Sequence, residues 1–315
     1  MDINLYEDKL SVDYENFLKT CINSTFLHSR AFLSYHKNKF RDKTIILREK
    51  NKIIGVLPAA VDLNDSKAIV SHPGLTYGGF LHDGNLKGEK MINAFQEVIN
   101  FYKRFSFDKL IYKSIPLNYF KTPCQDDLYA LSYLKAKKFR TDLSSVIYLK
   151  NRLRISSRRK RGYEKSIKNK IILDEGDHLL PRVWSILEEN LKNKYKTQPT
   201  HSLEEIKSLI KLFPEKIQVL ASKIEDRVLA GVVVFHTDNT THCQYITSSS
   251  EGQDLSASDL LFEKLIGKCV KDKKSFFSFG TSTENQGTIL NTNLYKFKSE
   301  FGAGGIIQDF YDLSF

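Results

Sequence analysis

Two distant parts of the chain share one pattern of apolar and polar positions. In the stretch "KIIGVLPAAV" (52–61), a charged residue and two apolar residues precede Gly55, and a further apolar run follows it. The stretch "RVLAGVVVFH" (227–236) has a similar arrangement around Gly231. Apolar runs of this length, rich in β-branched residues and ended by polar turns, are typical of buried strands. The pattern therefore predicts a similar strand in each half of the chain.

The segments around these two strands also recur in the same order. Each strand follows another strand and a hairpin turn, and it precedes a polar turn, an apolar segment, a glycine-containing loop, a segment of helical periodicity and an aromatic-rich strand. The corresponding stretches are 43–51 and 216–226 before the strands, "HDGNLKGEK" (82–90) and "SEGQDLSAS" (250–258) for the loops, 91–105 and 259–272 for the helices, and 107–115 and 274–282 for the last strands. This repetition predicts an α/β protein (α+β, with mixed sheets) built from two tandem units. We expect one domain over residues 1–150 and a second over 151–315.

The composition is that of an ordinary globular protein. Hydrophobic residues make up 41% and charged residues 27% of the 315 residues. No apolar run reaches the roughly 18 residues that a membrane-spanning helix needs, and the polar, acidic start "MDINLYEDKL" is not typical of a signal peptide. The four cysteines lack metal-ligand spacing, which favours reduced thiols and no metal site. We expect a cytoplasmic protein without stable membrane insertion.

The net charge of +11 predicts a partner or substrate that carries phosphates or carboxylates. Nine basic residues lie between Arg152 and Lys170, where Glu164 is the only acid. Such a run is typical of a solvated helix face, and it also suits the binding of phosphate or nucleic acid. The charge alone does not decide between these interpretations.

The loop 250–258 has the composition of a ligand-binding turn. Gly252, Ser256, Ala257 and Ser258 are small enough to let the backbone approach a ligand closely. A helix N-terminus with small polar residues is suited to an anionic phosphate. The alternative is a plain helix start, capped by Asp254, Ser256 or Ser258.

The repeated order resembles the core of the GNAT acyltransferases, in which a fourth strand enters a pyrophosphate-binding loop that is followed by a helix and a fifth strand. Two such units in tandem resemble the FemAB-type branch of that superfamily over nearly the whole chain. Four stretches carry a more particular resemblance to FemAB-like nucleotide-sugar N-acyltransferases of the FdhC type: "SHPGLTYGGF" (71–80), "YKSIPLNYFKTPCQDDLYAL" (112–131), "QPTHSLEEIKSLIKLFPEKIQVLA" (198–221) and "FSFGTSTENQGTILNTNLYKFKSEFGA" (277–303).

This resemblance implies an acyl-CoA-dependent N-acyltransferase in the cytoplasm of a bacterium. The acceptor it implies is the amine of a nucleotide-linked sugar, a 3-amino-3,6-dideoxyhexose on dTDP, used for surface polysaccharide (O-antigen lipopolysaccharide or capsule). Acetyl-CoA and 3-hydroxybutanoyl-CoA are the implied donors, and the amine would attack the thioester directly. The sequence departs from the family pattern at two places. The stretch "EGQDLSAS" keeps a single glycine of the coenzyme A loop, and "LYKFKSEFGA" contains Tyr295 but places its glycine later. The first loop matches less well still, so we expect coenzyme A in the second domain and a substrate platform in the first.

The resemblance places the pantetheine arm between splayed strands of the second domain, where backbone N–H groups would bind it and one would polarise the thioester oxygen. The expected cofactor-binding residues are Gln244, Tyr245, Ile246, Thr247, Gly252, Ser256, Ala257, Ser258, Asn291 and Tyr295. His242, in the same strand, is expected to point to solvent or to the core.

Three residues are candidates for the base that accepts the amine proton: His72, His201 and Glu284. Each has a structural alternative. His72 can bond a backbone carbonyl, and Glu284 can cap a turn. His201 can simply flank a helix start in which Ser202 and Glu205 form a capping box.

The candidates for substrate binding are Tyr77, Lys113, Asp127 (or Asp126), Tyr129 and Arg158. Arg158 would reach the diphosphate of the sugar nucleotide, and Lys113 offers a second cation. The tyrosines can equally be partly buried packing residues, as most tyrosines are.

Two other classes of function remain open. An aminoacyl-tRNA-dependent peptidoglycan transferase of the FemABX type would suit the positive charge. Such enzymes often carry a long helical arm, and the helical segments 179–194 and 203–212 are too short for one. A basic nucleic-acid-binding protein would lack any recognisable binding motif, and a purely structural role would require that both units have lost coenzyme binding. We expect a monomer without a nucleic-acid partner.

Overall fold

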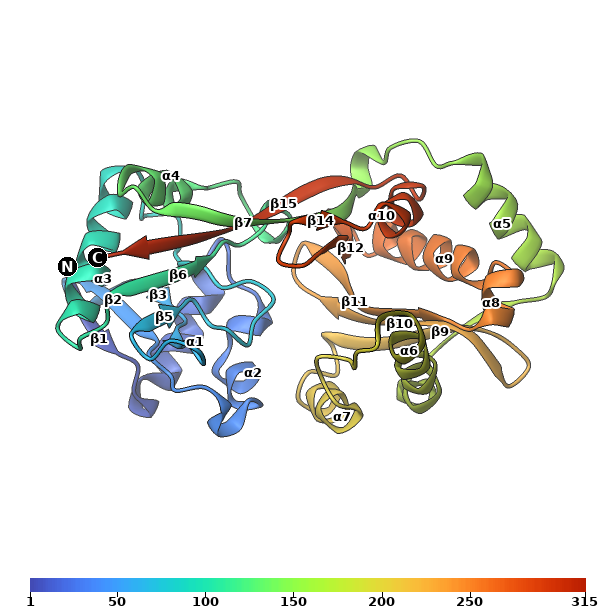
Figure 1. The fold of residues 1–315 in the computed structure, drawn as a ribbon, viewed down its shortest axis with the longest axis horizontal. Helices are drawn as coiled ribbons and strands as arrows, with labels where there is room; N and C mark the ends of the chain where they lie inside the picture. The colour runs from blue at the N-terminus through green and yellow to red at the C-terminus, as the bar shows by residue number, and fades with distance from the viewer. The chain divides into compact units, whose positions relative to one another are not determined.

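The computed structural model describes all 315 residues, apart from the side chain of Tyr195. The chain forms two compact units (Figure 1). The first contains Met1–Leu143, Thr283–Ile289 and Ile307–Phe315, and the second contains Ser144–Ser282 and Leu290–Ile306. The sequence pattern placed the division near residue 150, whereas the units change at 143 and two C-terminal segments return to the first unit. The last segment returns because it pairs with a strand of the first unit.

The second unit is built on a mixed sheet. Its strands, in spatial order, are β7 (Lys137–Tyr148, which begins in the first unit), β12 (Phe276–Thr281), β11 (Thr240–Ser248), β10 (Arg227–His236), β9 (Ile217–Ile224) and β8 (Ile172–Glu175). Only β11 and β12 are parallel neighbours among these pairs. The predicted strand–strand–strand–loop–helix–strand order is confirmed here.

Helices cover both faces of this sheet. Figure 1 shows α9 (Ala257–Lys271) on one side and α6 (Leu180–Tyr195) with α7 (Leu203–Leu212) on the other. Leu261 and Leu265 of α9 pack with Val232 and Val234 of β10, since strand residues two apart share a face. Gly231, which precedes Val232 and lies on the opposite face of β10, faces α6, where an added Cβ would lie 2.4 Å from Val183. The glycine therefore allows close packing of the helix on the sheet.

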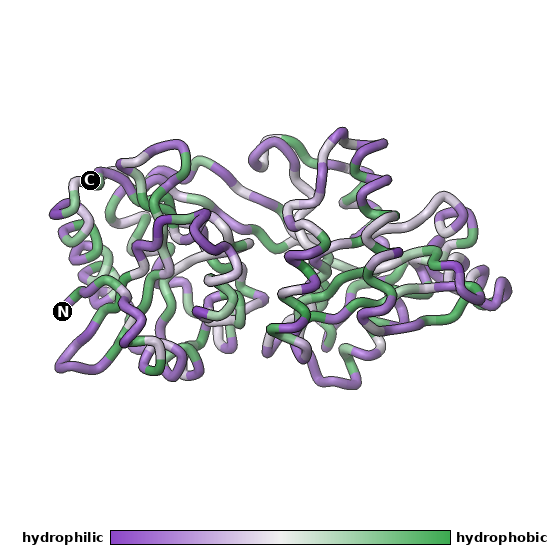
Figure 2. The backbone as a smooth tube through the Cα atoms, turned by 90° about the horizontal axis from the view of Figure 1, so that it is seen from below, coloured by the Kyte–Doolittle hydropathy of each residue, from purple (hydrophilic) through white to green (hydrophobic). Residues whose placement is uncertain are grey.

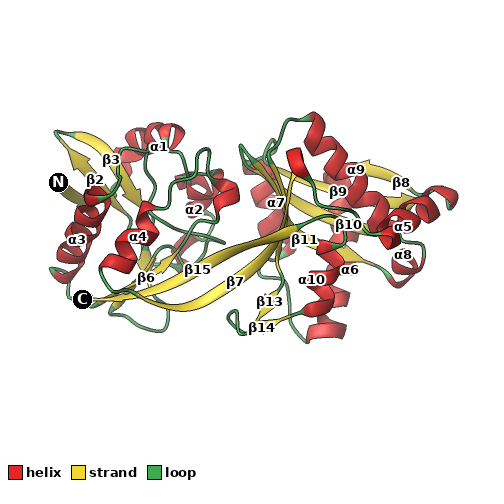
Figure 3. Ribbon diagram, turned by 90° about the horizontal axis from the view of Figure 1, so that it is seen from above, coloured by secondary structure: helices red, strands yellow, loops and turns green.

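Three further helices complete the second unit: α5 (Ser157–Lys168), α8 (Ser250–Asp254) and α10 (Thr292–Ser299). Figure 3 shows α5, α8 and α9 at one end of this unit. Figure 2 shows hydrophobic and hydrophilic residues interspersed along the chain in both units.

The first unit repeats the order of elements with a different sheet arrangement. One sheet contains β1 (Asp2–Leu5), β2 (Ile45–Glu49) and β3 (Lys52–Leu57), and the other strands are β4 (Ala60–Val61), β5 (Ala68–Val70), β6 (Lys109–Lys113) and β15 (Gly304–Ser314). Its helices are α1 (Ser11–Thr20), α2 (Arg30–Ser34), α3 (Glu89–Lys103) and α4 (Asp126–Tyr133), and β13 (Thr283–Glu284) and β14 (Ile289–Leu290) form a small hairpin. Over the described residues, no helix combines the length and apolar character needed to cross a membrane.

Candidate active site

The parallel strands β11 and β12 separate partway along their length. Their paired residues end at His242 and Ser278, whereas β11 continues to Ser248 in register with β10. Val233 and Val234 are consecutive in β10, but they pair with Tyr245 and Cys243 of β11. Gln244, which lies between these two, is therefore the extra residue of a β-bulge. A bulge of this kind bends a strand and increases its twist. The β12-facing edge of residues 243–248 is thereby left for another partner.

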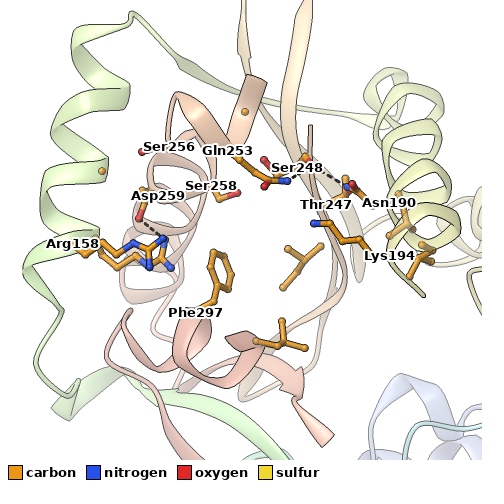
Figure 4. A pocket seen from close by; sticks show the side chains of 17 residues that line it. Arg158, Asn190, Lys194, Thr247, Ser248, Gln253, Ser256, Ser258, Asp259 and Phe297 are labelled. Atoms are coloured by element: carbon orange, nitrogen blue, oxygen red, sulfur yellow. Dashed lines mark hydrogen bonds and ion pairs between the residues drawn. The ribbon is translucent and has the colours of Figure 1, made fainter. Parts of the chain in front are cut away.

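A cavity of about 420 Å³ lies within the second unit beside the end of β11. It is lined by residues of five helices and one strand (Figure 4): Arg158, Arg159 and Gly162 of α5, Leu187, Asn190, Leu191 and Lys194 of α6, Ile246, Thr247 and Ser248 of β11, Gly252 and Gln253 of α8, Ser256 next to Ser258 and Asp259 of α9, and Leu294 and Phe297 of α10. Figure 4 shows Arg158 and Lys194 reaching toward the cavity from opposite sides. The cavity is therefore suited to an anionic ligand with an apolar portion.

The predicted glycine loop before α9 contains the short helix α8. Ser249 caps α8 by accepting a hydrogen bond from Gly252 N–H at 3.0 Å. Gly252 also packs against β10, since an added Cβ would lie 2.1 Å from the Leu229 carbonyl oxygen. The sequence pattern suggested Asp254, Ser256 or Ser258 as the cap of α9. Ser256 occupies that position with a left-handed φ of 60° and no side-chain cap.

The uncapped start of α9 faces the cavity. The first N–H groups of a helix have no partner within the helix, and the helix dipole makes this end electropositive. Ser256 and Ser258 line the cavity at this end. The arrangement provides donors for a phosphate group.

A buried arginine offsets the acidic groups next to this helix start. Arg159 is 5% exposed, and its guanidinium lies 3.1 Å from both Asp259 Oδ1 and Glu300 Oε2. It packs over the Phe297 ring at 4.4 Å. Burial raises the pKa of Asp259, although Arg159 acts in the opposite direction. Because an added Cβ at Gly162 would lie 2.6 Å from Asp259 Oδ2, glycine is required for α5 to approach α9.

Asn190 fixes the end of β11 to α6. Its Nδ2 donates to Thr247 Oγ1 at 2.8 Å and to the Ser248 carbonyl at 2.9 Å. The cavity wall therefore keeps its shape at the point where the strand ends.

A buried lysine lies where β11 and β12 separate. Lys298 of α10 is 3% exposed, and its Nζ donates to the carbonyls of Gly280 at 3.1 Å and Thr281 at 2.5 Å. Burial lowers the pKa of Lys298 to about 8. His242 Nδ1 lies 3.2 Å from Ser278 Oγ, and burial lowers the pKa of His242 to about 4, so its ring is neutral at pH 7.

Lys298 was not among the residues predicted from the sequence, although the spacing of its neighbours gave a signal. Leu294, Phe297 and Phe301 lie three and four residues apart, so they share one face of α10 and its extension. Lys298, four residues after Leu294, lies on that same apolar face.

The three candidate bases do not line the cavity. His201 is buried in the second unit, where its Nδ1 lies 2.5 Å from the Tyr245 hydroxyl, and the predicted capping box of Ser202 and Glu205 is confirmed. His72 belongs to the first unit. It has a φ of 52°, and burial, followed by the nearby His36, lowers its pKa to about 3. Glu284 lies in β13 of the first unit.

The expected cofactor-binding residues separate into two groups. Ile246, Thr247, Gly252, Ser256 and Ser258 line the cavity. The other five have different surroundings. Gln244 forms the bulge, Tyr245 packs on Trp184 with ring centroids 5.0 Å apart, and Ala257 is buried in the core. Asn291 caps α10 by accepting from Leu294 N–H at 2.9 Å, and Tyr295 lies outside the cavity lining.

Most of the expected substrate-binding residues of the first unit are in its interior. Tyr77 stacks on Tyr119 at 4.2 Å and donates to Thr25 Oγ1, which is the packing role given above as the alternative for the tyrosines. Asp127 is buried and accepts from the Tyr112 hydroxyl at 2.5 Å. Burial raises the pKa of Asp127 to about 6.

The two other first-unit candidates differ from each other in exposure. Lys113 Nζ donates to the carbonyls of His72 and Leu75, and burial, followed by the charge of Arg140, lowers its pKa to about 7. Tyr129 is 61% exposed. Among the described side chains there is no group of three or more His, Cys, Asp or Glu that could hold a metal ion.

Comparison with known proteins agrees with this geometry. Residues 150–296 match the acetyltransferase (GNAT) domain family, and no curated protein matches the chain. The structure of FemX is similar over 100% of this chain and 98% of that chain, with a TM-score of 0.70 and 11% identity. L-PGS from Bacillus licheniformis has a TM-score of 0.62 and 12% identity over 98% and 92% of the two chains.

A tandem GNAT protein from the clavulanic acid biosynthesis pathway covers 99% of this chain and 98% of its own, with a TM-score of 0.53 and 8% identity. These likenesses show the fold, and the family match identifies the domain. Residues 150–296 therefore match a GNAT acetyltransferase domain, and the chain as a whole shares its fold with FemX and with a tandem GNAT protein.

Proposed function

We propose that the protein transfers an acyl group from coenzyme A to the amine of a nucleotide-linked amino sugar. The observation that supports acyl-CoA best is the separation of β11 from β12 beside the cationic cavity at the start of α9. The pantetheine arm would add to the free edge of residues 243–248 as a further strand does. The phosphates would then lie over the first turn of α9, between Arg158 and Lys194.

The chemistry requires few protein groups. The amine nitrogen attacks the thioester carbonyl, a C–N bond forms, the C–S bond breaks, and the amine proton is lost while the thiolate gains one. A backbone N–H of residues 243–248 would stabilise the negative charge that develops on the carbonyl oxygen. We retain His72, His201 and Glu284 as proposed bases, acting directly or through water. Lys298 would hold the end of β12 in place, because its Nζ bonds the two carbonyls there.

We assign the acceptor to residues 1–150 and the donor to residues 151–315. The proposed acceptor is a dTDP-linked 3-amino-3,6-dideoxyhexose for surface-polysaccharide synthesis in the bacterial cytoplasm, and its support is the sequence resemblance given above. Of the first-unit candidates, the exposed Tyr129 is the one open to a ligand without rearrangement. Arg158 belongs with the donor phosphates in this scheme, since it lines the cavity of the second unit.

Calorimetric titration of coenzyme A into the wild type, Ser256→Glu and Ser256→Ala tests the donor site. We expect micromolar binding that Ser256→Glu weakens at least a hundredfold, because it places a carboxylate beside the phosphates. Ser256→Ala, like Ser256→Glu, keeps a non-glycine residue at the left-handed φ of 60° but adds no charge, so it should bind coenzyme A like the wild type. No binding of coenzyme A to the wild type would contradict the proposal.

A second candidate function is aminoacyl transfer from charged tRNA to a peptidoglycan precursor. It is favoured by the fold similarity to FemX and by the basic helix α5. The short helices α6 and α7 offer no long helical arm. Assaying the protein with acetyl-CoA and with aminoacyl-tRNA as donors separates the two functions, since only one donor should be consumed.

A further inference from the structure

The acyl-transfer scheme leaves most of the basic segment 152–170 without a role. In the structure this segment forms α5, whose buried face is made by Arg159, Gly162 and Ser166. Gly162 and Arg159 both meet Asp259 of α9, so this face is occupied. The opposite face of α5 is exposed to solvent.

This exposed face is strongly cationic. The exposed basic residues of the segment are Arg154, Arg158, Lys160, Arg161, Lys165, Lys168 and Lys170, whereas Glu164 is its only acid. Arg161, Lys165 and Lys168 lie four and three residues apart, so they form a stripe along one side of the helix. Among the side chains that the structure describes, Lys160, Arg161 and Lys168 form no ion pair. A stripe of cations that is not neutralised within the protein attracts a polyanionic partner.

Large apolar side chains accompany these cations. Leu153, Ile167 and Ile172 are 59%, 47% and 54% exposed, and they lie at the two ends of α5 or just beyond them. The segment's single aromatic residue, Tyr163, packs against the core of the second unit and is only partly exposed. Surfaces that bind single-stranded nucleic acid combine cations with exposed rings on which bases stack. Cations with exposed aliphatic side chains instead match a lipid surface, where the aliphatic groups enter the headgroup boundary.

We propose that the exposed face of α5 docks on the surface of an anionic lipid bilayer. The partner is identified by its chemistry: a surface of phosphate headgroups for the Arg161, Lys165 and Lys168 stripe, with an apolar boundary for Ile167. The helix lies flat on this surface over its length of about 18 Å, without crossing it. Docking of this kind is separate from acyl transfer and does not depend on the identity of donor or acceptor.

Vesicle co-sedimentation tests the proposal with the full-length protein. The probes are phosphatidylcholine vesicles with and without about one third phosphatidylglycerol. We expect binding to the anionic vesicles only, weakened about a hundredfold in Lys160→Glu/Arg161→Glu/Lys168→Glu, since each cation contributes about fivefold at such a surface. The control Lys192→Glu/Lys211→Glu/Lys271→Glu makes the same change of net charge on exposed residues of other helices and should bind within a few-fold of the wild type.

A single substitution distinguishes a membrane from RNA. Ile167→Ser should weaken vesicle binding several-fold and leave any retention of total tRNA unchanged. The proposal is overturned if the wild type does not bind anionic vesicles, or if both triple variants lose binding equally. It is also overturned if tRNA binds more tightly than the vesicles and only the α5 triple variant removes that binding, because α5 would then be a nucleic-acid surface. Circular dichroism of each variant shows that the fold is intact.

Discussion

The two units contain the same order of elements but treat the corresponding strand pair in opposite ways. In the first unit, β5 and β6 are paired to the end of β5 at Val70, and the contact continues because Ser71 N–H donates to the Ile111 carbonyl at 2.9 Å. In the second unit, pairing of β11 with β12 ends at His242, well before β11 itself ends. The two strands therefore stay paired in the first unit, whereas they separate in the second unit.

The helix that follows each pair shows the same contrast. At the start of α3, Asp126 Oδ1 accepts a hydrogen bond from Gly88 N–H at 2.7 Å. Burial acts to raise the pKa of Asp126, but this bond and the others it accepts lower it overall. At the start of α9 the corresponding position faces the cavity with Arg158 and Lys194. A carboxylate of the protein itself therefore occupies one helix end, and the other is left for a ligand.

The largest effect is expected from Arg159→Met. The substitution leaves the buried Asp259 without its ion-pair partner and leaves the partly buried Glu300 with only Arg158, at 4.0 Å, so we expect a loss of about 3–5 kcal/mol of unfolding free energy together with loss of coenzyme A binding. Arg161→Met, two residues along and exposed, should change stability by less than about 0.5 kcal/mol. Thermal unfolding and calorimetry measure both. Equal stability of the two variants would contradict the role assigned to Arg159.

Lys298→Met should remove two hydrogen bonds at the point of strand separation. Above pH 10 we expect a loss of about 1–3 kcal/mol, since two buried carbonyls lose their donor. The pKa of Lys298 is about 8 in the folded state, which is below the pKa of lysine in the unfolded chain. At pH values between these two pKa values, the unfolded chain holds a proton on Lys298 that the folded chain has lost. Wild-type stability should therefore rise with pH from about 8 to 10.5 relative to the variant.

Urea unfolding of the wild type and Lys298→Met at several pH values measures this difference. A difference that is constant from pH 7 to pH 10.5 would show that Lys298 is not buried as described. Lys298→Arg, which keeps a charge that does not titrate, should abolish the pH dependence.

In the first unit the pH dependence should have the opposite sign. The folded pKa of Asp127 is raised to about 6 by burial, so the folded state holds a proton that the unfolded chain has lost. The contribution of Asp127 is fully present below about pH 4 and is lost as the pH rises through 6. Relative to Asp127→Asn, the wild type should gain stability from pH 7 to pH 4, and unfolding at both pH values checks the sign.

The smallest effect is expected from Asp126→Asn. The amide oxygen can still accept from Gly88 N–H, so the start of α3 remains occupied. We expect one coenzyme A per chain and unchanged affinity by calorimetry. A second binding event would mean that the carboxylate alone distinguishes the two helix ends.

The sequence predicted the positions of helices and strands better than the pairing between strands. The stretch 227–236 coincides with β10 and 203–212 with α7, because apolar periodicity and the Ser202 capping box are local signals. Pairing of β15 with β6 was not predictable, since it joins residues about 200 positions apart in the sequence. The helix α8 was missed because the four polar residues around Gly252 have no periodicity of their own.

The candidate site was predictable only in part for the same reason. Loop composition identified Ser256 and Ser258, which line the cavity. Lys194 and Asn190 lie on a helix far away in sequence, and the burial of Arg159 depends on tertiary packing. The local pattern around each of these residues is that of an ordinary helix.

The most direct test of the account is amide hydrogen exchange with and without saturating coenzyme A. We predict that coenzyme A slows exchange at residues 243–248 of β11 and at the first turn of α9, while residues 68–88 of the first unit exchange at unchanged rates. Slowed exchange in the first unit, with none at β11, would contradict the assignment of the donor site to the strand gap of the second unit.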